Sequence, residues 1–312
     1  MSRHFASAAA ALALVAAAPA AAQTAPQPAG ESTPVEPLVV TAPTREVISE
    51  FVRNISAPTR ERKLARWNKT ICPATLGLQR RYAEYLNDRL AAAAMQAGVK
   101  VGKPGCSPDL LIIVTADPKA LLDQMAAEHG DFFAVNTFAH DRTSAGGGQD
   151  FAAFLASPEP VRWWHVSATV SAEGRPLGSS ANTIRVTSAT ADGKGFGSPP
   201  ALRVTSPSRL RDTVREDFQH ALLIVDAGQA RGVSYQALSD YVAMAALAQL
   251  DPRADTAGVP TILNLFKADA ASRPDGLTDW DRAYLRGLYG ARADAPDLRS
   301  QRGRILSTMR QR

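Results

Sequence analysis

The sequence predicts an α/β (α+β) fold in which helices pack on a mixed sheet. Segments with apolar residues at helical spacing alternate with short, unbroken runs of apolar and β-branched residues. The chain has 312 residues, of which 45% are apolar, enough to fill a core at this length. The 2 Cys, 21 Gly and 21 Pro exclude disulfide-scaffold and collagen-like classes.

Residues 1–22 have the pattern of a secretory signal peptide. Arg3 and His4 precede an apolar run, and three alanines precede Gln23. That run is shorter than the ~20 residues needed to span a bilayer. We therefore expect a periplasmic or secreted protein without a transmembrane anchor and without a nucleic-acid partner.

Residues 23–44 are rich in Pro, Ala and Thr and lack periodicity, which predicts a disordered linker. Thr44 is a suitable cap for a helix over 45–54. Its apolar stripe consists of Val47, Ile48, Phe51 and Val52.

Residues 45–140 are expected to form an N-terminal α/β part. The spacing predicts a helix over 76–97 that ends at Gly98. An apolar run predicts a strand over 110–115, and Asp117-Pro118 opens a helix that continues to Glu128. The inward-facing residues of the helix over 76–97 should be Leu78, Tyr82, Tyr85, Leu86, Leu90 and Met95.

Cys72 and Cys106 lie on either side of the helix predicted over 76–97. In an oxidising compartment we expect them to form a disulfide rather than a free or reactive thiol pair. Two thiolates without histidine ligands do not complete a structural zinc site.

Residues 150–290 are expected to form the C-terminal part. A glycine-rich loop over 141–149 precedes a strand over 161–170, whose alternation should send one of Trp163 and Trp164 inward and leave the other on a surface. The segment 173–207 is too polar for a core and predicts a long excursion with a weak hairpin.

The remaining elements follow from capping residues and apolar runs. They are a strand over 221–225, a helix over 235–249 that follows Ser234, and a helix over 278–289 that ends at Gly290. Residues 291–312 form a basic tail, expected to be a solvated helix end or a contact with anionic lipid, acidic polysaccharide or a protein partner.

The order of elements from 221 to 290 resembles the closing half of metzincin-type zincin domains. In that family a helix carries His-Glu-x-x-His and a tight turn lies under the metal. The final helix often begins Leu-Thr-x-x-Asp and ends Leu-Tyr-Gly, as Leu277 to Asp281 and Leu288 to Gly290 do here. The resemblance implies a zincin-like body.

The metal ligands of that family have no counterpart in this sequence. If Asp240 is set on the family's glutamate, the three metal positions fall on Ser239, Ala243 and Gln249, and no histidine follows His220. A zinc-dependent hydrolase needs three ligands, two of them at i and i+4 on the helix. We expect no metal and no cofactor on this helix.

The chain also resembles a secreted Gram-negative family of unknown function. The segments that carry this resemblance are 65–73, 104–106 and 238–244. The resemblance implies no activity.

Three polar residues are candidates for ligand binding or for a buried polar role: Asp240, Asn264 and Gln236. Asp240 lies in an apolar helix, where a carboxylate needs a partner such as a helix-end N–H, Asn264 or an arginine. A hollow lined by Asp240 and Asn264 would suit a peptide. The Gly193–Gly197 segment lacks the spacing of a phosphate-binding loop.

Two functions remain. The first is a non-catalytic binding or scaffold protein, a pseudoenzyme on a zincin-like fold, with an envelope protein or peptide as partner and no catalytic residue. The alternative is a hydrolase of envelope peptide or glycan that uses carboxylates such as Asp240 and Asp226. It would need one of the scattered histidines, which are His129, His140, His165 and His220. We expect the first.

Overall fold

The computed structural model describes residues 44–59, 62–133, 143–145, 151–176, 183–184, 201–202 and 210–311. The expected signal peptide, almost all of the linker, His140, the Gly193–Gly197 segment and most of the polar excursion lie outside these residues.

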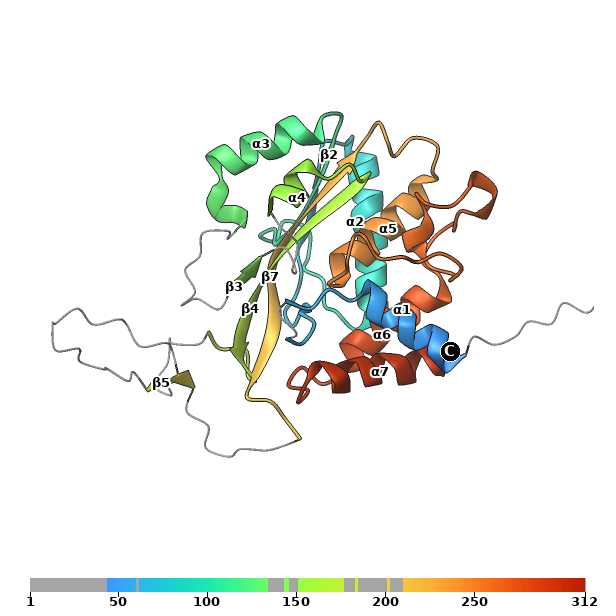
Figure 1. Cartoon of the computed structure of the whole chain (residues 1–312). Coiled ribbons are helices and arrows are strands. Elements are labelled where there is room, and N and C mark those ends of the chain that lie inside the picture. Colours follow the sequence, from blue (N-terminus) through green and yellow to red (C-terminus); the bar gives the residue numbers. More distant parts are fainter. Residues whose placement is uncertain are drawn as a thin grey trace, which may run out of the picture. The chain divides into compact units, whose positions relative to one another are not determined.

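The centre of the fold is a mixed sheet with the strand order β1-β2-β7-β4-β3 (Figure 1). Strands β1, β2 and β7 run parallel to one another, β4 is antiparallel to β7, and β3 is antiparallel to β4. Strands β5 and β6 form a separate antiparallel pair. The strands are β1 (Pro73–Leu76), β2 (Leu110–Thr115), β3 (Thr143–Ala145), β4 (Val161–Ser171), β5 (Thr183–Ile184), β6 (Ala201–Leu202) and β7 (Val214–Asp226). The mixed α/β class is confirmed.

The two parts of the sequence share this sheet, because β2 pairs with β7 along its whole length, from Leu110 opposite Ala221 to Thr115 opposite Asp226. Strand β7 begins seven residues earlier than the predicted start, at Val214, and its first half pairs with β4. That half is polar, and its carboxylates are paired within the sheet: Glu216 accepts from the Thr169 hydroxyl, and Asp217 pairs with Arg215.

Strand β1 was not predicted, and the prediction that a helix starts at residue 76 is wrong. The chain turns at Gly77, whose φ is +81°. A Cβ atom there would lie 1.9 Å from the carbonyl oxygen of Val114, so only glycine fits beside β2. Helix α2 therefore begins at Arg80.

Helices cover both faces of the sheet (Figure 1). Elements α3, η2 and α4 pack on one face of the sheet, and α2 and α5 pack on the opposite face. The helical elements are α1 (Arg45–Ile55), α2 (Arg80–Ala97), α3 (Pro118–Glu128), η2 (Gly130–Phe133), α4 (Phe151–Ala156), α5 (Tyr235–Leu247), η4 (Ile262–Asn264), η5 (Ala270–Ser272), α6 (Asp279–Gly290) and α7 (Leu298–Arg310).

This double cover buries both tryptophans of β4. Trp163 donates to the carbonyl of Leu250 on the α5 side, and Trp164 donates to the carbonyl of Phe133 on the α3 side. The expectation that one tryptophan stays on a surface is wrong, because η2 and α4 place aromatic rings over it.

Capping residues define several helix ends as the sequence predicts. Thr44, Asp117 and Ser234 accept hydrogen bonds from the first turns of α1, α3 and α5. Gly98 ends α2 in the left-handed region at φ +92°. The predicted apolar stripes are only partly right, because Val47, Tyr82, Tyr85 and Met95 are exposed.

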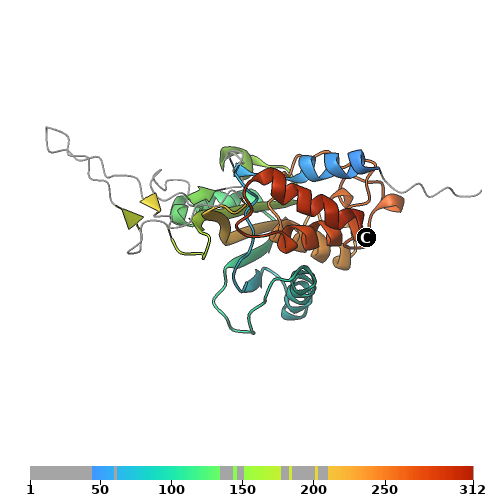
Figure 2. The same cartoon turned by 90° about the horizontal axis from the view of Figure 1, so that it is seen from below.

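The segment expected as a basic tail folds as helix α7, which lies against α6 and α1 (Figure 2). Its Gln301 side chain accepts from the backbone N–H of Leu64 and donates to the carbonyl of Leu64. Ile305 and Met309 are fully buried. Four arginines of this segment, Arg299, Arg302, Arg304 and Arg310, are therefore held on a packed helix.

Cys72 and Cys106 form the expected disulfide, with Cα atoms 6.0 Å apart. It ties the start of β1 to the loop before β2 and is consistent with an oxidising compartment. Among the described residues, no helix is long and apolar enough to cross a membrane.

Candidate functional site

Helix α5 is the element that places the sequence-predicted site residues. Ser234 caps its first turn, and every residue from Ala237 to Leu247 is buried. Ala, Val, Leu and Met fill most of these positions, so the helix packs against neighbours all round. A polar side chain here must find its partners within the protein.

Asp240 finds its partner on α2. Its Oδ1 accepts from Arg89 Nε at 2.9 Å, and its Oδ2 accepts from Arg89 Nη2 at 2.6 Å. Asp240 is 2% exposed, whereas the Arg89 side chain is 32% exposed. The hydrogen bond with Asp240 raises the pKa of Arg89 above its usual value. The pair is a bidentate salt bridge with one buried and one partly solvated end.

The chain before α6 completes the surroundings of Asp240. The backbone N–H of Leu277 donates to Oδ2 at 2.8 Å. A Cβ atom on Gly276 would lie 2.6 Å from the same oxygen and 3.5 Å from Gln236 Nε2. Gln236 donates to the carbonyl of Asp275. Asp240 and Gln236 therefore both fasten the 275–277 segment to α5.

Asn264 serves a different segment. Its Nδ2 donates to the carbonyls of Thr256 and Val259, and its Oδ1 accepts from the Thr256 hydroxyl. These bonds close the loop before η4, so the side chain of Asn264 is engaged within its own loop rather than with Asp240.

The turn at η4 is held by Asp281 of α6. Its Oδ1 accepts from the Thr261 hydroxyl at 2.6 Å, and its Oδ2 accepts from the backbone N–H groups of Ile262 and Thr278, both at 2.8 Å. Thr278 and Asp281 also form a capping box at the start of α6. The Leu-Thr-x-x-Asp segment therefore fixes the turn and starts the helix at once.

Two of the three positions that the zincin resemblance assigns to metal ligands, Ser239 and Gln249, have structural partners, and the third, Ala243, is buried. Ser239 donates to the carbonyl of Tyr235, one turn earlier. Gln249 accepts from the backbone of Ala65 and donates to the Thr59 hydroxyl. In the described part of the chain, no three His, Cys, Asp or Glu side chains are placed to hold a metal ion.

The two carboxylates of the hydrolase alternative, Asp226 and Asp240, have partners other than histidine in the described part of the chain. Asp226 accepts from the backbone N–H groups of Gly228 and Gln229 in the turn after β7. Although burial raises the pKa of Asp226, its hydrogen bonds with Gln229 and Gly228 lower it overall. His220 contacts the carbonyl of Phe132, and burial lowers its pKa. Among the described residues, no histidine is hydrogen-bonded to Asp240 or Asp226.

Three tyrosines at the amino-terminal ends of α2 and α5 form a surface that the sequence analysis missed. Tyr82 and Tyr85 are 40% and 39% exposed, and their rings lie 5.5 and 5.4 Å from the ring of Tyr235. The Tyr235 hydroxyl donates to the carbonyl of Tyr82, and burial raises the pKa of Tyr235 to about 12.

We call Tyr82, Tyr85 and Tyr235 the tyrosine surface. Arg81 lies over the Tyr82 ring at 4.6 Å. Arg89 follows Tyr82 and Tyr85 at helical spacing on α2, and this i, i+3, i+7 pattern is the signal that marks one face. From the sequence, Tyr82 and Tyr85 were expected to face the core.

A scan against protein-family models, a search of curated proteins and a search of solved structures each find no match to this chain.

Proposed function

We propose that the chain is an exported, non-catalytic binding protein on a zincin-like body, with a peptide or envelope protein as its partner. Two features support the body. The order of the elements after β7 fits the family resemblance, and Asp281 anchors the turn before α6. The signal-peptide pattern and the disulfide support export.

The observation that carries the proposal is the environment of Asp240. A general base needs free access to a proton on its substrate. Both oxygens of Asp240 accept from Arg89, and Oδ2 also accepts from Leu277. The carboxylate in the place of the family's glutamate is therefore committed to joining α2, α5 and the chain before α6.

The tyrosine surface is the proposed contact with the partner. Tyrosine rings give a large, rigid contact area with a polar tip, which suits recognition of a peptide. Tyr235 is fixed by its hydrogen bond to α2, so the surface is held in shape before binding.

The binding test is selection from a phage-displayed peptide library on the mature protein. We expect enriched peptides whose affinity falls at least tenfold in Tyr85→Ala. The matched control is Met95→Ala on the same helix, where Met95 is 61% exposed. No enrichment, or equal loss in both variants, contradicts the proposal.

The activity test separates the hydrolase alternative. Purified peptidoglycan and unfolded envelope-protein substrates are incubated with the wild type and with Asp240→Asn. We expect no cleavage by either protein. Cleavage by the wild type that disappears in Asp240→Asn overturns the non-catalytic proposal.

A further inference from the structure

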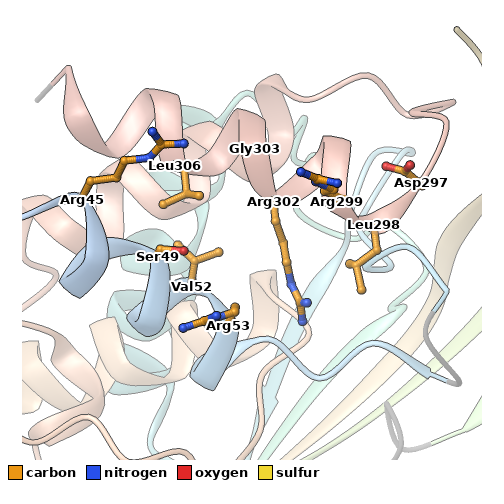
Figure 3. Close-up of a pocket in the computed structure, with 10 residues that line it drawn as sticks. All are labelled: Arg45, Ser49, Val52, Arg53, Asp297, Leu298, Arg299, Arg302, Gly303 and Leu306. Atoms are coloured by element: carbon orange, nitrogen blue, oxygen red, sulfur yellow. The ribbon is translucent and has the colours of Figure 1, made fainter.

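A cleft of about 580 Å³ lies between α1 and α7 (Figure 3). It is distinct from the tyrosine surface, which belongs to α2 and α5. Four arginines line it, two from each helix, and we call it the arginine cleft. They are Arg45, Arg53, Arg299 and Arg302.

The salt bridges of the described residues include none of these four guanidinium groups. Within the described residues none of the four forms an ion pair or a hydrogen bond from its side chain, and Arg302 Nε is buried without a partner. Arg302 extends from α7 towards α1 (Figure 3). An unpartnered buried N–H normally costs free energy, so this atom is one that a ligand oxygen would satisfy.

One acidic residue, Asp297, lies among the residues that line the cleft. Its Oδ1 accepts from the backbone N–H of Ser300 at 2.7 Å as the cap of α7. That hydrogen bond, with a smaller contribution from Arg299, lowers the pKa of Asp297. The lining of the cleft therefore contains four arginines and one carboxylate, and that carboxylate already caps α7.

The wall between the arginines is apolar. Val52 of α1 is buried, and Leu306 of α7 is half-buried beside it. A ligand that fits both features has an anionic head with several oxygens and a carbon part. A guanidinium group donates two parallel hydrogen bonds to two oxygens of a phosphate. A phosphate also has more oxygens to share among four arginines than a carboxylate has.

We infer that the arginine cleft binds a phosphate ester, with the phosphate between the arginines of α1 and α7 and the carbon part against Val52 and Leu306. The ester belongs to a soluble metabolite or to the headgroup of an anionic phospholipid. The arginine cleft is then the site at which the carboxyl-terminal basic segment contacts anionic groups, and α1 provides two of its four arginines.

The test measures binding of glycerol 3-phosphate to the mature protein by calorimetry at low salt. Sedimentation with phosphatidylcholine vesicles, with and without phosphatidylglycerol, measures binding to the lipid headgroup. We expect the double variant Arg53→Gln/Arg302→Gln to lose at least tenfold in affinity. The control Arg304→Gln/Arg310→Gln removes the same number of charges, from positions of α7 outside the cleft, and should change affinity by less than about twofold.

A second variant guards against misfolding, because Arg302 is partly buried. Arg45→Gln/Arg299→Gln changes two exposed arginines of the cleft and should also weaken binding. Vesicle binding that glycerol 3-phosphate displaces identifies a lipid headgroup, and binding of glycerol 3-phosphate alone identifies a soluble ester. Either result supports the inference.

Three results overturn it. The first is the absence of binding to both probes. The second is an equal loss of affinity in the Arg304→Gln/Arg310→Gln control, which indicates a non-specific response to net charge. The third is equally tight binding of glutarate, a dicarboxylate of similar charge.

Discussion

Arg89 and Asp240 join α2 to α5 through two hydrogen bonds of 2.9 and 2.6 Å, although 151 residues separate them in the sequence. The pair is asymmetric, because Arg89 reaches solvent and Asp240 does not. Its two halves should therefore respond differently to mutation.

Arg89→Gln should destabilise the protein more than Asp240→Asn. The first variant leaves a buried carboxylate without its cation, which costs about 2–3 kcal/mol after allowance for the partial exposure of Arg89. The second leaves an arginine that turns to water and an amide that still accepts from Leu277, at a cost of about 1–2 kcal/mol. Urea unfolding of both variants measures the difference.

The control for this pair is Glu84→Gln, which breaks the exposed i, i+4 pair with Arg80 on the same helix. It should change the free energy of unfolding by less than about 0.5 kcal/mol. A larger loss in Asp240→Asn than in Arg89→Gln would show that the buried carboxylate is not the sensitive half.

Removal of the disulfide by Cys72→Ser/Cys106→Ser should lower stability. The chain-entropy model gives about 4 kcal/mol for the sequence separation of 34 residues. Chemical denaturation of wild type with and without reductant should reproduce the difference between wild type and variant. Equal midpoints in all samples would contradict the expectation.

His165 should make the protein sensitive to acid. Its ring is stacked on Phe218 with centroids 4.5 Å apart, and Nε2 has no hydrogen-bond partner among the described residues. Burial lowers the pKa of His165 to about 4, against partial opposition from the carbonyls of Ala246 and Ala245. The unfolded state, with a pKa near 6.5, therefore binds the proton first.

The neutral ring thus contributes stability that is fully present above about pH 6.5 and is lost as the pH falls to about 4. The loss is on the order of 3 kcal/mol. In His165→Phe this part of the pH dependence should disappear, while His129→Phe, at an exposed position, should keep it. Urea unfolding at pH 7 and pH 4 measures the free energy of unfolding of each variant. If His165→Phe loses as much stability between these pH values as the wild type, the prediction is wrong.

Gly287 sets how closely α6 and α7 approach. A Cβ atom there would lie 2.7 Å from the Cα atom of Ile305, a backbone atom that moves only with its helix. Gly287→Ala should therefore cost about 1–3 kcal/mol despite the better helix propensity of alanine.

Gly290 provides the matched substitution three residues later. A Cβ atom there meets no other atom within 4 Å, so Gly290→Ala should be neutral or slightly stabilising. Thermal unfolding of the two variants tests this contrast. Equal destabilisation of the two variants would contradict the prediction, because only Gly287 lies close to Ile305.

Local chemistry made several elements predictable. Thr44, Asp117, Ser234 and Thr278 start helices because their side chains accept from backbone N–H groups only a few residues away. The run at 110–115 signals a covered strand because every residue needs burial on one face or the other.

Other features depend on distant neighbours. Strand β1 forms because it pairs with the edge of β2, and this pairing needs Gly77 to pass close to Val114. Helix α7 is buried because Gln301 and Ile305 meet Leu64 and Gly287. Neither relation leaves a signal in the nearby sequence.

The amino-acid order alone determined where α1, α3, α5 and α6 begin, that Cys72 and Cys106 pair, and that Asp240 needs a partner. The tertiary structure decided that the partner is Arg89, that Asn264 serves its own loop, and that four arginines of α1 and α7 face one cleft. The physical reason is range. Capping and periodicity act over a few residues, whereas burial of a charge or the meeting of two helices depends on how the whole chain packs.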